Sequence, residues 1–70
     1  MSQYTVERFL DRCSNKDIIV VLWDLDDFDD SVPSVEFNIK NDSRARKYLQ
    51  YEIERFEIDN NGDLNLWIFH

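Results

Sequence analysis

The chain has 70 residues, a formal net charge of −7, and a composition that is 43% hydrophobic and 14% aromatic. This length suits one domain, residues 1–70, and excludes a deep, enclosed active site. The hydrophobic content, together with a single Gly and a single Pro, excludes a disordered chain. The lone Cys13 and the absence of an apolar run longer than IIVVLW predict a cytoplasmic protein with no disulfide and no membrane segment.

The N-terminal segment predicts a helix over residues 3–14. Its apolar side chains recur at the spacing of one helical face: Val6, Phe9, Leu10 and Cys13. Ser2 is a candidate cap at its start, and Asn15 is a candidate left-handed residue at its end.

Two strands follow in the sequence. Residues 17–25, DIIVVLWDL, are β-branched and aromatic at successive positions, which is typical of a central strand covered on both faces. Residues 34–40 alternate, with Val35, Phe37 and Ile39 apolar, and this pattern predicts a half-buried strand. A hairpin-like return through the acidic segment between them is the simplest connection.

Residues 41–56 predict a second helix, because capping residues precede one apolar stripe: Ala45, Tyr48, Leu49, Ile53 and Phe56. The chain then closes with a hairpin. A two-residue loop, Asn61-Gly62, would set Ile58 opposite Asn65, whereas a three-residue loop from Asn60 to Gly62 sets it opposite Leu64. The same three-residue loop pairs Phe56 with Leu66, so we predict this loop, with Gly62 at positive φ.

These elements predict an α+β domain in the order α-β-β-α-β-β, with an antiparallel sheet of about four strands and both helices packed on one face. If Leu64, Leu66 and Ile68 face the core, period two sends Trp67 and Phe69 to the other face. There they form either a partly exposed cluster with Trp23 or Val21, or an interface with a second copy or another partner.

Residues 22–33, LWDLDDFDDSVP, contain five aspartates within seven positions. The stretch VVLWDLDDF resembles the first motif of the haloacid-dehalogenase phosphatases, in which Asp-x-Asp follows an apolar strand. The resemblance implies that Asp24 is a nucleophile and Asp26 a general acid. Phe28 stands where that family usually has Thr or Val, and the chain is too short for the family's parallel sheet. We therefore do not assign the family.

Other catalytic and metal-binding patterns are also missing from the sequence. A calcium loop counted from Asp24 places Phe28 at its fifth position and Val35 at its twelfth, and neither residue can bind the ion through its side chain. Cys13 falls on the predicted core face, and His70 is the single histidine. We therefore expect a protein that is not an enzyme and has no catalytic residue, metal site or cofactor. Weak binding of a divalent cation and a contribution to a shared site stay open as alternatives.

The negative charge is concentrated in two segments. The net charge is −5 over residues 22–41 and −3 over residues 57–70. It is zero over residues 1–21 and +1 over residues 42–56. This distribution excludes ordinary nucleic-acid binding, which requires a basic surface. In an extended chain, pairs such as Asp24 and Asp26, or Asp27 and Asp29, would be about 6 to 7 Å apart, close to the spacing of phosphates along one strand.

We therefore expect a small acidic protein that binds stoichiometrically to a basic, nucleic-acid-handling partner and inhibits it. It resembles nucleic-acid mimics and antirestriction, anti-CRISPR and immunity proteins in size and charge alone. The charges would come from Asp24, Asp26, Asp27, Asp29 and Asp30, the anchors would be Trp23 and Phe28, and a second acidic edge would be formed by Glu57, Asp59 and Asp63 if the hairpin lies nearby.

Two alternatives to this function stay open. One is a non-catalytic assembly subunit or homo-oligomeric scaffold, including a homodimer, that uses the sheet face around Trp67 and Phe69. The other is a solvated acidic loop with no partner. The sequence also leaves open whether three basic residues neutralise the acidic loop internally: Arg44, Arg46 and Lys47.

Overall fold

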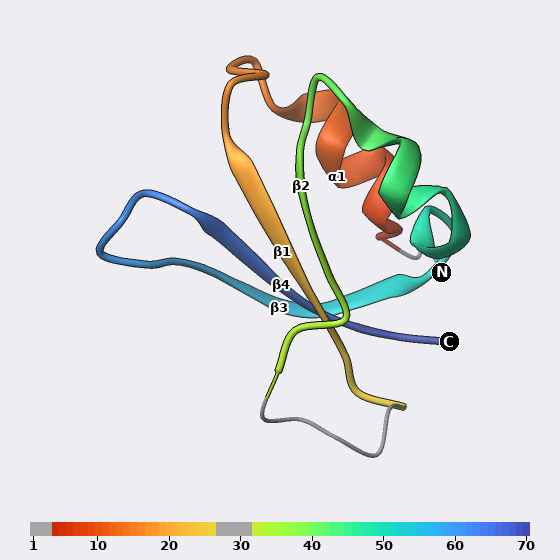
Figure 1. Ribbon diagram of the computed structural model, residues 1–70. Helices are drawn as coiled ribbons and strands as arrows, with labels where there is room; N and C mark the ends of the chain where they lie inside the picture. The colour runs from red at the N-terminus through yellow and green to blue at the C-terminus, as the bar shows by residue number, and fades with distance from the viewer. Residues whose placement is uncertain (1–3, 27–31) are drawn as a thin grey trace.

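The computed structural model describes residues 4–26 and 32–70 (Figure 1). Its elements are α1 (Val6–Arg12), β1 (Ile19–Asp24), β2 (Val35–Asn38), the 3₁₀ helix η1 (Asp42–Tyr48), β3 (Glu52–Ile58) and β4 (Leu64–Phe69). The strands form one four-stranded mixed sheet, and the chain also has two short helices. This combination is that of the expected α+β domain. Within these residues, no helix is long and apolar enough to cross a membrane.

The sheet has the strand order β2-β1-β4-β3. The β1–β2 and β3–β4 pairs are antiparallel, but β1 and β4 run parallel, so the prediction of a wholly antiparallel sheet is wrong. The central place predicted for β1 is confirmed. The two most apolar strands, β1 and β4, occupy the centre of the sheet, where each has a neighbouring strand on both edges.

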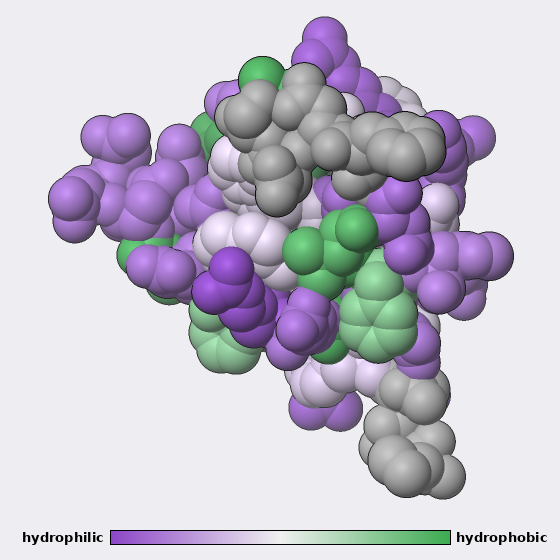
Figure 2. All heavy atoms as spheres, turned by 90° about the horizontal axis from the view of Figure 1, so that it is seen from below, coloured by the Kyte–Doolittle hydropathy of each residue, from purple (hydrophilic) through white to green (hydrophobic). Residues whose placement is uncertain are grey.

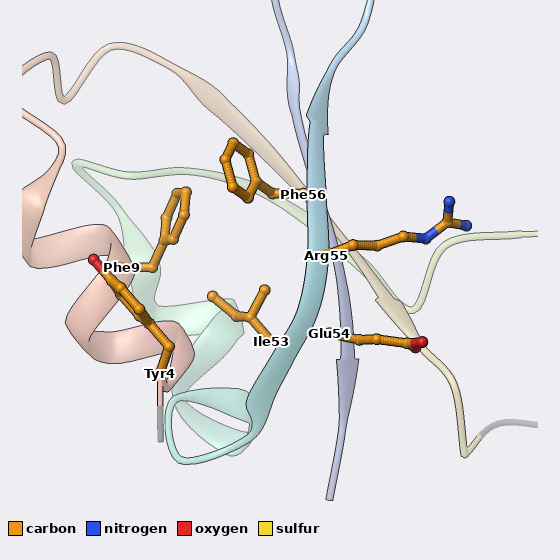
Figure 3. Close-up of a pocket in the computed structure, with 6 residues that line it drawn as sticks. All are labelled: Tyr4, Phe9, Ile53, Glu54, Arg55 and Phe56. Atoms are coloured by element: carbon orange, nitrogen blue, oxygen red, sulfur yellow. The ribbon is translucent and has the colours of Figure 1, made fainter. Parts of the chain in front are cut away.

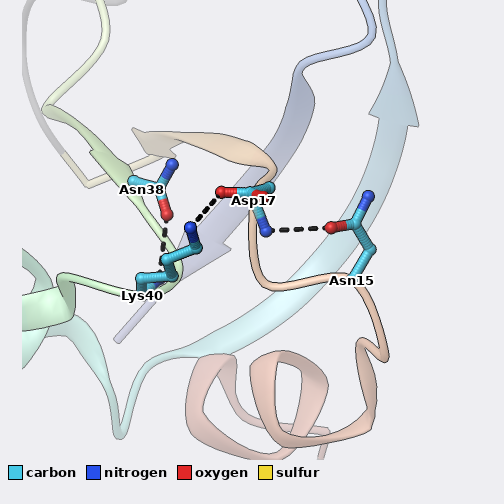
Figure 4. A network of polar contacts seen from close by, with 4 residues as sticks. All are labelled: Asn15, Asp17, Asn38 and Lys40. Carbon is cyan, nitrogen blue, oxygen red and sulfur yellow. Dashed lines mark hydrogen bonds and ion pairs between the residues drawn. The ribbon is translucent and has the colours of Figure 1, made fainter.

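The first helix is shorter than predicted. It begins after Thr5, whose Oγ1 accepts a hydrogen bond from the Arg8 N–H at 3.3 Å, and it ends at Cys13, which is extended with φ −75° and ψ 116°. Asn15 does not end it in a left-handed conformation. Its Oδ1 instead accepts from the Asp17 N–H at 2.9 Å (Figure 4). In the same network Asp17 forms an ion pair with Lys40, which ties the α1–β1 connection to the segment after β2.

The second helix also ends earlier than predicted. It is a 3₁₀ helix that stops at Tyr48, and β3 begins at Glu52. Ile53 and Phe56, which we expected on a helical stripe, therefore lie on a strand. The register of β3 against β4 shifts between Ile53 and Arg55, so that Ile53 and Phe56 are paired with Ile68 and Leu66 on one face of the sheet.

The core lies between one face of the sheet and the helices. The cluster consists of Val6, Leu10, Val20, Leu22, Phe37, Ile39, Ala45, Leu64, Leu66 and Ile68. The cluster includes Leu64, Leu66 and Ile68, so the inward orientation predicted for these alternate residues of β4 is confirmed. Backbone N–H groups of Val6 and Glu7 donate to the carbonyls of Tyr51 and Leu49, which joins the start of α1 to the chain after η1.

The register predicted for the final hairpin is also confirmed. Ile58 pairs with Leu64 and Phe56 with Leu66. The Asp59 N–H donates to the Asp63 carbonyl at 3.0 Å, which leaves a three-residue loop between them. Gly62 closes this loop with φ 82°.

Replacing Gly62 tests this turn. Nothing lies within 4 Å of a Cβ added there, so the cost of Gly62→Ala comes from the left-handed backbone alone. We expect Gly62→Ala to lower the free energy of unfolding by about 1 to 2 kcal/mol, measured by urea denaturation. Gly62→Asn is the control, since Asn tolerates this conformation, and an equal loss in both variants would contradict the assignment.

Candidate functional site: the outer face of the sheet

The outer face is the side of the sheet that points away from the core cluster. Strand pairing arranges its side chains in two neighbouring rows. One row is Trp23, Trp67 and Arg55, and the other is Glu36, Val21, Asn65 and Glu57. Adjacent strands lie about 4.8 Å apart, so the second row holds its two glutamates roughly 14 Å from each other.

The indole rings of Trp23 and Trp67 stack on this face. Their centroids are 6.1 Å apart and their planes differ by 11°. The guanidinium carbon of Arg55 lies 4.2 Å from the centroid of a Trp67 ring, an arrangement that favours attraction between the cation and the ring face. Both indoles are only half-buried. The outer face is thus an ordered aromatic surface that stays partly open to solvent.

Asn65 connects this stack to the tip of the hairpin. The Trp23 Nε1–H donates to Asn65 Oδ1 at 2.9 Å, and Asn65 Nδ2 donates to Asp59 Oδ2 at 3.1 Å. An indole N–H can only donate and an ionised carboxylate can only accept, so these two partners fix the orientation of the amide. Asn65 Nδ2 also donates to the Asp63 carbonyl at 3.4 Å. Because Asn65 is just 9% exposed, loss of the Trp23 indole would leave its Oδ1 unpaired, and loss of Asp59 would leave its Nδ2 with the longer of its two hydrogen bonds.

Asp59 is held in its charged form by the turn. Its Oδ1 accepts from the backbone N–H groups of Asp63 at 3.0 Å and Asn61 at 2.9 Å. The hydrogen bond from Asp63, followed by those from Asn65 and Asn61, lowers the pKa of the Asp59 carboxyl below its ordinary value. Both oxygens of this predicted partner-binding residue therefore support the hairpin.

The acidic turn begins where β1 ends. Leu25 and Asp26 form a turn in which the Asp26 N–H donates to Asp24 Oδ1 at 2.9 Å. Asp26 Oδ2 accepts from the backbone N–H of His70 at 2.8 Å. The extended spacing predicted for Asp24 and Asp26 is therefore wrong, because the chain folds back to make these hydrogen bonds. Asp27, Phe28, Asp29 and Asp30 lie outside the described residues.

The acidic turn and the hairpin tip lie at opposite ends of the sheet. Since β1 and β4 are parallel, Asp24 is level with Ile68 while Val20 is level with Leu64, and Asp63 lies just beyond Leu64. At about 3.3 Å per residue, this places Asp24 and Asp63 roughly 16 Å apart along the strands. The hairpin therefore does not lie beside Asp24 and Asp26, and Glu57 joins the outer face instead of a second acidic edge at that turn.

Most of the contacts that the structure gives to basic side chains are with aromatic rings or a backbone carbonyl, and one is with an acidic side chain. Arg12 lies over Tyr4, Lys47 over Tyr48 and Arg55 over Trp67, and Lys16 donates to the Leu10 carbonyl. Among the side chains that the structure describes, the one ion pair is Lys40 with Asp17. Arg44, Arg46 and Lys47 thus form no ion pair with Asp24 or Asp26. They belong to η1, which follows β2 and packs beside that strand.

Among the described side chains, no group of three or more His, Cys, Asp and Glu could hold a metal ion. Cys13 packs against the core, and its thiol donates to the Phe9 carbonyl at 3.5 Å. Seen from below, hydrophilic residues occupy most of the molecular outline, with hydrophobic surface visible between them (Figure 2).

Sequence reasoning placed Trp23, Trp67 and Phe69 on or near one surface, but it missed Arg55 and Asn65. Arg55 was assigned to a helix, and Asn65 was used only to reject a loop length. The period-two pattern of NLWIF could have marked Asn65 as an outer-face residue beside Trp67. Its hydrogen bond to Trp23 depends on the parallel β1–β4 register, for which the sequence has no local signal.

Replacing Asp59 tests the link between hairpin and stack. In Asp59→Asn, one oxygen can still accept the backbone hydrogen bonds, but the new amide cannot accept from Asn65. We expect a lower urea midpoint and a shift in tryptophan fluorescence. Because the folded-state pKa is depressed, the advantage of the native protein is present above the unfolded pKa of about 4 and is lost as pH falls through the folded value.

The control for this prediction is Asp63→Asn, since the Asp63 carboxylate makes no hydrogen bond to any residue that the structure describes. Urea denaturation of the three proteins at a series of pH values from neutral to acidic measures the effect. An identical pH dependence for Asp59→Asn and the native protein would contradict the role of this carboxylate.

Comparisons of the chain with protein-family models, with curated proteins and with solved structures found no match.

Proposed function

We propose that this protein is a small, non-catalytic cytoplasmic binding protein that attaches stoichiometrically to a basic protein surface and inhibits its owner by covering that surface. A basic groove of a nucleic-acid-handling protein is the partner with the required chemistry. The contact would use the outer face, with the Trp23–Trp67 stack as anchor, together with the acidic turn. The sequence continues after Asp26 with four further residues predicted to bind the partner, which lie outside the described residues: Asp27, Phe28, Asp29 and Asp30.

The observation that carries this proposal is that three described acids of this surface form no internal ion pair with any described side chain. Asp26, Glu36 and Glu57 are exposed, and none of them has an ion-pair partner among the described residues. Arg55, the basic residue of the outer face, lies over the Trp67 ring. Acidic side chains around a partly open aromatic pair give charge for long-range attraction and apolar area for affinity.

The hydrogen-bonded order of the outer face also supports binding. Asn65 fixes one indole and Arg55 covers the other, so the aromatic surface would lose little side-chain entropy when a partner covers it. Each partner would need a planar or apolar group opposite the rings and cations opposite the acids. Arginine supplies both in one side chain.

The first test is capture from a lysate of the cells in which the protein occurs, after enrichment of basic proteins on heparin. The bait is the native protein, compared with D26N/D27N/D29N/D30N and with D26N/E36Q. We expect one retained protein whose association slows by about tenfold when charges are removed, with a smaller change in dissociation. E7Q/D11N is the matched control for D26N/E36Q, since it removes two exposed charges from α1.

Two further measurements identify the surface that the partner uses. Added salt should weaken association steeply, and duplex DNA or RNA should compete for the partner. Salt-independent binding, or equal loss in the α1 control, would contradict an electrostatic contact at the outer face and acidic turn.

A second candidate is an assembly subunit that self-associates through the outer face. It is favoured by the positions of Trp67 and Phe69, which are half-buried on that face. Here Trp67→Ala combined with Phe69→Ala should convert an oligomer to a monomer in sedimentation equilibrium, whereas D26N/E36Q should leave its mass unchanged. An oligomer that survives the double replacement would reject this surface.

A further inference from the structure

The outer edge of β3 is open over most of its length. β3 is the last strand in the sheet order, and β4 occupies its inner edge. At its start, Thr5 bridges to Glu52 and the Ile53 N–H donates to the Tyr4 carbonyl at 2.9 Å. Among residues 4–26 and 32–70, no segment pairs with this edge from Glu54 to Ile58. Unpaired N–H and C=O groups of such an edge can accept another strand.

Large apolar side chains emerge beside this edge. Phe56 and Ile58 are 59% and 62% exposed, although their pairing with Leu66 and Leu64 puts them on the core side of the sheet. Phe37 on the opposite edge strand, β2, is only 5% exposed, because η1 packs beside that strand. The helices therefore cover the core face at β2 and leave it uncovered at the end of β3.

A groove of about 420 Å³ continues this apolar surface toward α1. Tyr4, Phe9, Ile53 and Phe56 point toward one another around it, while Glu54 and Arg55 point to the other side of β3 (Figure 3). The Phe9 ring centroid lies 5.2 Å from that of Phe56 and 5.8 Å from that of Tyr4. The open edge thus has an apolar side and a charged side.

We propose that this edge pairs with the same edge of a second copy of the chain, forming a two-fold dimer with one continuous sheet. The occupant is a second copy because the strand is complementary to itself, as its register shows. This edge shares Arg55 and Glu57 with the outer face, and it adds Phe56 and Ile58 on the core side of the sheet. The dimer and the contact with a basic partner are read by different measurements, so either proposal can fail without the other.

Only a few registers are compatible with such a dimer. A two-fold axis that pairs identical strands antiparallel is perpendicular to the sheet, so residues opposite each other must share a face. Arg55, Phe56 and Glu57 alternate between faces and follow the bulge in regular register with β4. Ile58 continues this register. An axis at Ile58 would set Glu57 opposite Asp59 of the second copy, which are two like charges, so three positions remain for the axis: Arg55, Phe56 and Glu57.

Charge selects among the three registers. An axis at Arg55 or at Glu57 would set two like charges directly opposite each other, which destabilises a strand pair. An axis at Phe56 sets the two phenyl rings opposite each other on the core side. It also sets each Arg55 opposite Glu57 of the second copy on the outer side. Ile58 then lies diagonal to Phe56 of the other chain, within reach of its ring.

The same geometry stops the assembly at two copies. Pairing between the two β3 strands cannot extend toward the start of β3, because Thr5 already pairs with Glu52 there and the register shifts after Ile53. Pairing consumes the β3 edges, and the remaining edges of the joined sheet are the β2 strands, which are four residues long with their phenylalanine covered. Short edge strands of this kind resist further pairing.

Sedimentation equilibrium of charge variants tests the register. The native protein should be in monomer–dimer equilibrium between micromolar and submillimolar concentrations. In the dimer, position 55 of each copy lies opposite position 57 of the other. R55E therefore creates two acid–acid pairs and E57R two base–base pairs, so each variant should weaken dimerisation by about tenfold or more. An equimolar mixture of the two variants should recover a heterodimer, because its pairs are again complementary. The double variant R55E/E57R should likewise recover a homodimer.

Circular dichroism of each variant verifies its fold, since Arg55 also covers Trp67. A native protein that stays monomeric throughout the range overturns the proposal. Two folded single variants that fail to associate when mixed overturn it as well, because a contact elsewhere would not depend on this pairing.

Cross-linking supplies a second measurement that does not use charge. In a Cys13→Ser background, Phe56→Cys should give a disulfide-linked dimer when oxidised with diamide, because directly opposed residues have Cα atoms within disulfide range. Val32→Cys in the same background is the control, since Val32 is similarly exposed, at 56%, and precedes β2, which forms the opposite edge of the sheet from β3. Equal cross-linking of both variants, or none at Phe56→Cys, would overturn the proposed register.

Discussion

The parallel pairing of β1 with β4 is the contact on which the remaining structure depends. Each of these strands belongs to an antiparallel pair with a neighbour, and two-stranded units are marginal by themselves in water. Joining them aligns Val20 with Leu64 and Leu22 with Leu66, and all four residues are buried. The same register stacks the indoles on the outer face. One long-range pairing therefore builds the core and the candidate site together.

Much of this fold could be predicted wherever the controlling interactions are local. The hairpin register followed from matching apolar residues across a short loop, and Gly62 followed from its turn geometry. The second helix was extended too far for a physical reason. A bulge shifts the alternation of a strand by one position, so Ile53 and Phe56 share a face at a spacing of three, which is also the spacing of a helical stripe.

The candidate site could be predicted only in part, because its members come from both hairpins. The alternation of side chains along a strand placed Trp67 on the outer face. The sequence cannot show that Trp23 stacks on Trp67, or that Asn65 bridges Trp23 to Asp59. Those contacts depend on which strands become neighbours. The parallel arrangement also separates the acidic turn from the hairpin tip, and an antiparallel arrangement of the same strands would have brought them together.

The two proposed surfaces are connected by symmetry. A two-fold axis perpendicular to the sheet keeps the outer faces of both copies on the same side, so their tryptophan pairs and exposed glutamates would form one extended surface. Net charge opposes this pairing, since each copy carries −7, and the opposition weakens when cations surround the protein. A basic partner that spans both outer faces would supply those cations, and it would also bind two sites at once. Binding of such a partner should therefore favour the dimer, and the dimer should in turn raise affinity for the partner, because linked equilibria are reciprocal.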